Sequence, residues 1–200
     1  MKMPSKSAGF SMIEVLIAVL ILAIGLLGVA ALQMASLTQG QESYFRSQAT
    51  ALAEDLASRI RAGRHAAKAT APAWGAPTWV DDPAGAAAAY ASLYNDSPYL
   101  CENPPPSNCR EDEMAGAAVP CAIQDLVAYE QWDVCSQAAT LIPEGQVHVV
   151  TNNLRTTIAV SWLATEARED TGEEEIRNPV CNEVFALAAE RDCVVVEAVP

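Results

Sequence analysis

The chain has 200 residues, of which 51% are hydrophobic, and its 12 basic and 25 acidic residues give a formal net charge of −13. This length suits one modest domain with an anchoring segment rather than two domains. The excess of acidic residues argues against binding of nucleic acid, or of an anionic membrane surface, by the folded part of the chain.

An uncharged apolar run dominates the N-terminal part of the chain. Residues 15–32 carry no charged or strongly polar side chain, and the first charge after Glu14 is Glu42. A helix over this run, at about 1.5 Å of rise per residue, spans roughly 27 Å, nearly the hydrocarbon thickness of a bilayer. The run therefore predicts a transmembrane helix, which we place at residues 10–35. Lys2 and Lys6 precede it and favour a cytoplasmic N-terminal end.

Two features distinguish this run from an ordinary secretory signal. The small residues Ala8 and Gly9 lie before the apolar run, whereas a secretory signal is cleaved after it, where Ala35-Ser36 is a weak candidate. The second feature is Glu14, a carboxylate one turn inside the apolar helix. Such a group is costly in lipid and indicates a function or a specific partner, unless it reaches water at the cytoplasmic interface.

The hexapeptide from Gly9 to Glu14 reads Gly-Phe-Ser-Met-Ile-Glu. It resembles the prepilin signature of type IV pilins and type II secretion pseudopilins, whose usual form is Gly-Phe-Thr-Leu-Ile-Glu. The resemblance implies that prepilin peptidase cleaves after Gly9 and N-methylates Phe10. It also implies that Glu14 guides subunit docking by meeting the N-terminal amine of a neighbouring subunit. An amine and a carboxylate attract strongly in low-dielectric surroundings, which agrees with that role.

Further patches resemble the PilV family of minor pilins. One is the apolar extension at 22–33, and weaker ones lie at 125–132, 141–145 and 158–162. The resemblance implies a minor pilin of a type IV pilus that acts in pilus assembly or priming. Its implied partners are prepilin peptidase, other minor and major pilins, and the inner membrane.

The expected domain organisation has three parts. Residues 1–9 form a cytoplasmic leader, residues 10–62 one long helix, and residues 63–200 a periplasmic head. After removal of the leader, 10 basic and 25 acidic residues remain. Gly63 is a plausible cap for the helix. Beyond the membrane the helix has an apolar stripe that needs a partner, formed by Phe45, Ala49, Leu52, Leu56 and Ile60.

The head is expected to supply that partner as a small antiparallel sheet. Asp82 and Pro83 favour the start of a short helix, and helical spacing predicts another over residues 121–139. Alternation and β-branched residues predict about four strands, at 146–150, 155–164, 184–188 and 193–199. The fold class predicted is α+β, with a long N-terminal helix packed on a small sheet; the pilin resemblance implies the same arrangement.

Six cysteines occur in the expected head and none in the long helix. An even number in a translocated domain of this size predicts up to three disulfides, for which fifteen connectivities exist. We take sequence neighbours as the default pairing. A zinc site is the alternative, but no C-x-x-C occurs, and His65 and His148 are distant from cysteine in sequence. The default pairs are Cys101–Cys109, Cys121–Cys135 and Cys181–Cys193.

No catalytic motif is recognisable in the chain. It has no G-x-S-x-G, P-loop, dinucleotide-binding glycines or H-E-x-x-H. His65 and His148 are interpreted as surface or structural residues. The acidic runs 111–113 and 173–175 are interpreted as solvated loops rather than calcium sites. We therefore expect no enzymatic activity, no cofactor, no metal and no small-molecule substrate.

Two other functions remain open from the sequence. A type II secretion pseudopilin would share the N-terminal signature. A periplasmic binding or enzymatic domain on a simple signal anchor would instead keep Met1, or be cleaved after the apolar run, and would have a recognisable pocket in its head.

Overall fold

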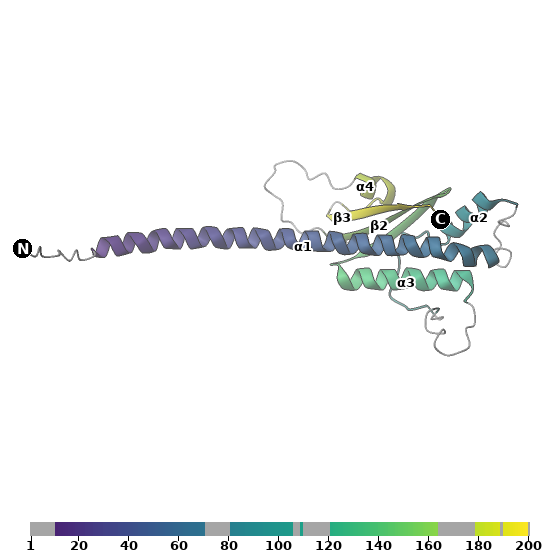
Figure 1. Ribbon diagram of the computed structural model, residues 1–200, viewed down its shortest axis with the longest axis horizontal. Coiled ribbons are helices and arrows are strands. Elements are labelled where there is room, and N and C mark those ends of the chain that lie inside the picture. Colours follow the sequence, from purple (N-terminus) through teal and green to yellow (C-terminus); the bar gives the residue numbers. More distant parts are fainter. Residues whose placement is uncertain are drawn as a thin grey trace, which may run out of the picture. The chain divides into compact units, whose positions relative to one another are not determined.

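The structure, a computed structural model, describes residues 11–70, 81–105, 109, 121–163, 179–188 and 190–199. The chain divides into two compact units, Met1–Gln41 and Glu42–Pro200. Helix α1, Met12–Thr70, belongs to both units. The second unit also contains three shorter helices and a three-stranded sheet (Figure 1), which confirms the α+β class: α2 Pro83–Ser92, α3 Ile123–Leu141, β1 Gln146–Asn152, β2 Arg155–Leu163, α4 Pro179–Phe185 and β3 Arg191–Ala198.

Helix α1 continues beyond the end predicted at residue 62. Gly63 lies inside the helix, and a Cβ atom built there would be 2.2 Å from the hydroxyl oxygen of Tyr90. The glycine therefore makes room for a tyrosine of α2 and does not cap the helix. A cap and a close approach of a side chain both favour glycine, so the sequence could not distinguish them.

The sheet is antiparallel, with the strand order β1-β2-β3. Strands β1 and β2 form a hairpin closed by Asn153 and Leu154, and Asn153 has a φ of 56°. Asparagine tolerates this left-handed conformation, which a two-residue hairpin loop requires. The described residues contain three strands, whereas about four were expected.

The missing strand is the one predicted at 184–188. Its first two residues end helix α4 instead. A short apolar run has no clear period, so it is compatible with either a helix or a strand. Pro179 begins α4, which suits a helix because its fixed φ is helical and its missing N–H would have no partner there.

The core lies between the sheet and the second part of α1. Figure 1 shows α3 alongside this part of α1, and an ion pair between Arg59 and Asp133 joins the two helices. The predicted apolar stripe of α1 is buried or half-buried there. On the opposite face of the sheet, Phe185 of α4 packs with Ala159 and Cys193. Because both faces of β2 are covered, the seven residues from Thr156 to Trp162 are all buried.

Candidate functional site

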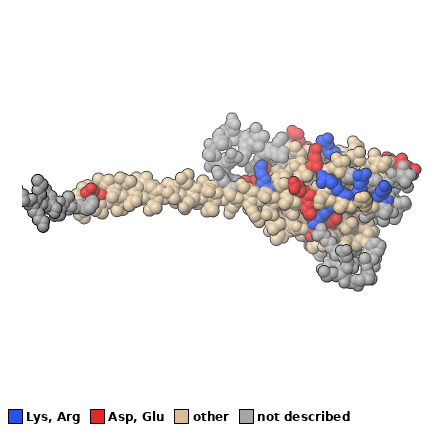
Figure 2. All heavy atoms as spheres, in the orientation of Figure 1, with Lys and Arg blue, Asp and Glu red and all other residues tan. Residues whose placement is uncertain are grey.

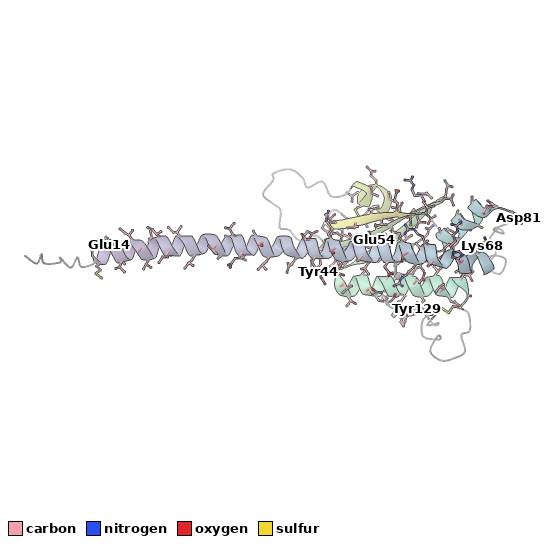
Figure 3. All side chains as sticks on the ribbon, viewed as in Figure 1. Glu14, Tyr44, Glu54, Lys68, Asp81 and Tyr129 are labelled. Atoms are coloured by element: carbon pink, nitrogen blue, oxygen red, sulfur yellow. A yellow bond between two sulfur atoms is a disulfide. The ribbon has the colours of Figure 1, made fainter. Side chains whose placement is uncertain are left out.

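Glu14 lies in the first turn of α1 (Figure 3), where the positive end of the helix dipole favours a carboxylate. The backbone N–H of Glu14 donates to the carbonyl oxygen of Ser11 at 3.0 Å. Its side chain is exposed, and no cationic side chain among the described residues lies within ion-pair distance of it. The acidic group is therefore available to a cation that another molecule supplies.

The helix surface that follows Glu14 is apolar and uncovered. Every residue from Ser11 to Leu37 is exposed, including Leu26 at 69% and Leu27 at 71%. The most apolar window of α1 has a mean hydropathy of 3.1, and none of it is buried. In Figure 2 the part of this surface that follows Glu14 is uncharged, whereas acidic and basic side chains crowd together over the second unit. An apolar surface of this extent requires lipid or other helices to cover it.

One helix among the described residues is thus long and apolar enough to cross a membrane. Gly9 and Phe10, the predicted cleavage and methylation site, lie outside the described residues. The structure therefore shows Glu14 and the apolar surface of the predicted site, but not the peptide bond that the peptidase would cut.

In the second unit, polar contacts fasten α1 to the sheet. The indole N–H of Trp162 donates to Glu42 at 3.1 Å, and Arg46 pairs with Asp192 at 2.9 Å. Glu42 and Arg46, four residues apart on α1, thus each contact a strand of the sheet. These contacts hold the sheet against the part of α1 that begins at Glu42, the first charged residue after Glu14.

A buried arginine fastens α1 to α3. Arg59 is 9% exposed and pairs with Asp133 at 2.6 Å and with Asp55, four residues before it, at 2.7 Å. Burial alone would lower the pKa of Arg59, but the hydrogen bonds and charges of the two aspartates outweigh it and raise the pKa. The guanidinium therefore stays charged and holds the two helices together.

The structure corrects two of the three predicted disulfides. Cys181–Cys193 is present as expected and joins α4 to β3. The other two bridges are Cys101–Cys135 and Cys109–Cys121, with Cα–Cα distances of 5.6 and 5.9 Å. The predicted bridge between Cys121 and Cys135 is wrong. The helical residues of α3 between them separate their Cα atoms by about 18 Å or more, far beyond the reach of a disulfide.

The histidines differ in their surroundings. His65 is exposed on α1, whereas His148 is only 2% exposed. The Nδ1 atom of His148 lies 2.9 Å from the Ser97 hydroxyl, and its Nε2 atom lies 3.0 Å from the Ser161 hydroxyl. Burial and the positive charge of Arg191 lower the pKa of His148 to about 4. A buried, neutral imidazole with both nitrogens engaged is a structural residue. His148 therefore fits the structural interpretation, and the exposed His65 fits the surface one.

The sequence analysis did not identify Glu130 of α3 as a buried charged residue. Glu130 is 8% exposed and accepts a short hydrogen bond from the hydroxyl of Tyr94, whose oxygen lies 3.1 Å from that of Tyr90. Burial raises the pKa of Tyr90 to about 12 and that of Tyr94 further. Hydrogen bonds thus satisfy a carboxylate inside the core. Glu130 lies three residues after Val127 and four before Val134, a spacing that places it on the buried face of α3. Its charge favoured an exposed position instead.

The head has a pocket beside α3. It has a volume of about 220 Å³, and its lining includes Tyr99, Leu100 and Trp132. Typical small-molecule sites enclose roughly 300–1,000 Å³. None of the described residues form a group of histidine, cysteine or acidic side chains able to hold a metal ion.

Comparison with known proteins identifies the N-terminal segment. Residues 4–30 match the family model described as the prokaryotic N-terminal methylation motif. No curated protein and no solved structure matches the chain. The match indicates a type IV pilin-like or pseudopilin protein, and implies processing by prepilin peptidase and association with pilins. With the exposed apolar surface of α1, it also indicates anchoring in a membrane.

Proposed function

We propose that this protein is a minor pilin of a type IV pilus, cleaved after Gly9 and N-methylated at Phe10 by prepilin peptidase. The observation that carries the proposal is the methylation motif at 4–30, which continues into an exposed apolar helix whose first charge is Glu14. The motif allows the subunit to be processed, and the apolar helix anchors it in a membrane. The carboxylate of Glu14 allows it to join a helical bundle.

The mechanism begins at the membrane. Lys2 and Lys6 hold the leader in the cytoplasm, where the peptidase reaches the bond after Gly9. The apolar part of α1 then keeps the subunit in the inner membrane as a single-pass protein, with its head in the periplasm. An oxidising periplasm agrees with three disulfides and no free cysteine among the described residues.

Docking follows from the electrostatics of Glu14. A carboxylate in lipid carries a large desolvation penalty, which a neighbouring amine offsets only when it is held close by. The methylated N-terminus of an adjacent subunit supplies that amine. Pairing therefore selects one axial position for the incoming subunit, while the apolar surfaces of adjacent helices cover one another.

The choice of a minor subunit rests on the resemblance to PilV-type proteins in the apolar extension and in the head. In this role the subunit joins other minor pilins in a complex that primes polymerisation of the major pilin. The proposal assigns no enzymatic activity to the head.

A type II secretion pseudopilin is the second candidate, because the methylation motif fits it equally well. Deletion of the gene in its native cell separates the two. We expect loss of surface pili with normal export of secreted enzymes, and restoration of pili by the wild-type gene. Normal piliation together with loss of enzyme export would contradict the minor-pilin assignment and favour the pseudopilin.

A further inference from the structure

The pocket beside α3 lies between two segments that are covalently joined. Residues of the segment 96–105 form one wall, and residues of α3, among them Gln131 and Trp132, form the other. The disulfide between Cys101 and Cys135 links the two walls, with a Cα–Cα distance of 5.6 Å. The pocket is therefore formed before a partner arrives, which reduces the conformational entropy lost on binding.

Hydrogen bonds fix the first wall on the sheet. Asp96 exchanges backbone hydrogen bonds with Val149 of β1 at 3.1 and 2.9 Å. The N–H of Tyr99 donates to the carbonyl oxygen of Val147 at 2.9 Å. The hydroxyl of Tyr99 donates to the carbonyl oxygen of Tyr94 at 2.7 Å. The wall is thus held in one position by the strand beside it and by the helix that the disulfide reaches.

Acidic side chains surround the pocket, and none of its lining residues is basic. Asp96 lines it directly, and Glu102 lies between two lining residues in the sequence. Asp125 precedes the lining residue Ala128 by three positions, so the two share one face of α3. No lysine or arginine occurs in the segment 95–105 or in α3. The surface around the pocket is therefore negatively charged.

The three carboxylates around the pocket differ from those on the inner side of α3. There, Asp133 pairs with Arg59 at 2.6 Å, and Glu130 accepts a hydrogen bond from the hydroxyl of Tyr94. In contrast, no cationic side chain of the described residues lies within ion-pair distance of the three carboxylates around the pocket. Their charge is therefore available to a cation from another molecule.

The side chains inside the pocket suit a cationic group. Oδ1 of Asp96 accepts a hydrogen bond from the N–H of Ser97 at 2.9 Å. Burial raises the pKa of Tyr99, and the charge of Asp96 raises it further, because this carboxylate lies near the phenol. Trp132 is half-buried, with its ring centroid 6.0 Å from that of Tyr129. A carboxylate beside aromatic rings binds an ammonium or guanidinium group by ion pairing and by cation–π attraction.

The size and the rim of the pocket indicate a side chain of a protein. Its volume of about 220 Å³ is below the roughly 300–1,000 Å³ of typical small-molecule sites. Leu100 at the rim is 79% exposed, more than any other large apolar side chain described in the second unit. An exposed apolar residue beside an aromatic pocket is typical of a protein contact. A second copy has the same formal net charge of −13, which opposes its approach.

We propose that this pocket binds an arginine or lysine side chain of a different protein, with an apolar residue of the same partner seated on Leu100. The basic group pairs with Asp96 and lies against Trp132. Glu102 and Asp125 attract it from outside the pocket. The proposed function enters in one respect only, namely that the partner is found among the components of the same membrane assembly.

Photo-crosslinking in native membranes identifies the occupant. A benzophenone side chain at Leu100 should form an adduct with a different protein, and the adduct peptide should contain arginine or lysine. The same probe at Leu154, which is 39% exposed in the loop between β1 and β2, is the matched control and should not form this adduct. No adduct at 100, or an adduct only with a second copy or within the same chain, would overturn the proposal.

Charge reversal tests the role of the carboxylate. Asp96→Lys should lower the adduct yield at least about tenfold, because it places a cation where the partner's cation binds. Glu54→Lys on the exposed surface of α1 (Figure 3) changes the net charge equally and should leave the yield unchanged. Equal yields from these two variants, both folded by thermal unfolding, would contradict the proposal.

A neutral variant covers the case in which the lysine at position 96 disturbs the fold. Asp96→Asn keeps an oxygen that accepts the hydrogen bond from Ser97 but loses the charge, so its adduct yield should fall as well, by a smaller factor. An unchanged yield with this variant would contradict the ion pair.

The identified partner allows a reciprocal test. Replacement of its basic residue by glutamate should restore the adduct with the Asp96→Lys variant, and a failure to restore it would show that the two charges do not meet. These yields are measured in membranes and do not depend on filament incorporation. Failure of the minor-pilin assignment, which the N-terminal mass and the piliation of the deletion strain reveal, is therefore distinguishable from failure of the pocket.

Discussion

The indole Nε1 of Trp162 donates a hydrogen bond of 3.1 Å to the carboxylate of Glu42, the first charged residue after Glu14 along the chain. Trp162 is fully buried at the end of β2, so the bond joins the sheet to the beginning of the second unit. The contact satisfies an indole N–H that would otherwise be buried without a partner, a state that is costly in a protein core.

Replacement of Trp162 by Phe should therefore lower the free energy of unfolding by about 1–3 kcal/mol, because the bond to a charged acceptor is lost. Urea unfolding of the full-length protein in detergent measures the change. In a Glu42→Ala background the same replacement should have a clearly smaller effect. Equal effects in the two backgrounds would mean that the bond contributes no stability.

Replacement of Glu14 by Ala should leave the subunit inserted and processed but exclude it from filaments. We expect its filament content to fall at least about tenfold, which corresponds to about 1.4 kcal/mol of lost docking free energy. Immunoblots of sheared filaments and of membranes measure the two pools. Gln33→Ala, an exposed polar position of the same helix, is the control and should be incorporated normally. Wild-type incorporation of the Glu14 variant would contradict the docking role.

The buried imidazole of His148 makes stability depend on pH. Burial, then the charge of Arg191, lowers its pKa to about 4 in the folded protein, against an ordinary value of 6.5 in the unfolded chain. The unfolded state therefore binds the proton first as the pH falls, and stability decreases between pH 6.5 and 4. The loss from this group should reach about 2 kcal/mol at pH 5.

The comparison that isolates this contribution is the wild type against His148→Gln, with unfolding free energies measured at pH 7 and pH 5. The variant lacks the titrating group but retains hydrogen-bonding capacity towards Ser97 and Ser161. The carboxylates titrate in both proteins, so their effect cancels in the difference. Parallel pH profiles would show that His148 does not remain neutral.

The disulfide connectivity can be read from a tryptic digest without reduction. Cleavage after Lys68, Arg110 and Arg155 separates a peptide with Cys101 and Cys109 from one with Cys121 and Cys135. The observed pairing links these two peptides, so one joined species should appear by mass spectrometry. Two unlinked peptides, each with an internal disulfide, would instead support pairing of sequence neighbours.

Local chemistry made several elements predictable. Asp82 caps α2 as expected, since its side chain accepts a hydrogen bond from the N–H of Gly85 at 2.8 Å. The alternation of apolar and polar residues predicted a strand at 155–164, and β2 occupies Arg155–Leu163. The apolar run of α1 was equally clear. In each case the signal lies within a few neighbouring residues and does not depend on tertiary contacts.

Features that depend on packing were not predictable in the same way. The burial of Glu130 depends on a hydrogen bond from Tyr94, which follows α2. The close contact at Gly63 depends on Tyr90 of α2. The error over Cys121 and Cys135 was avoidable, because a helix predicted over 121–139 already separates them too far. Gly9, Phe10 and the acidic runs 111–113 and 173–175 lie outside the described residues, so those predictions stay untested by the structure.

The most direct test of the central claim is the mass of the N-terminal peptide, taken from sheared surface filaments and from the membrane fraction. The proposed function predicts a methylated Phe10 terminus in both. An intact Met1 terminus in cells that contain active prepilin peptidase, or cleavage after the apolar run, would contradict it and leave a signal-anchored protein instead.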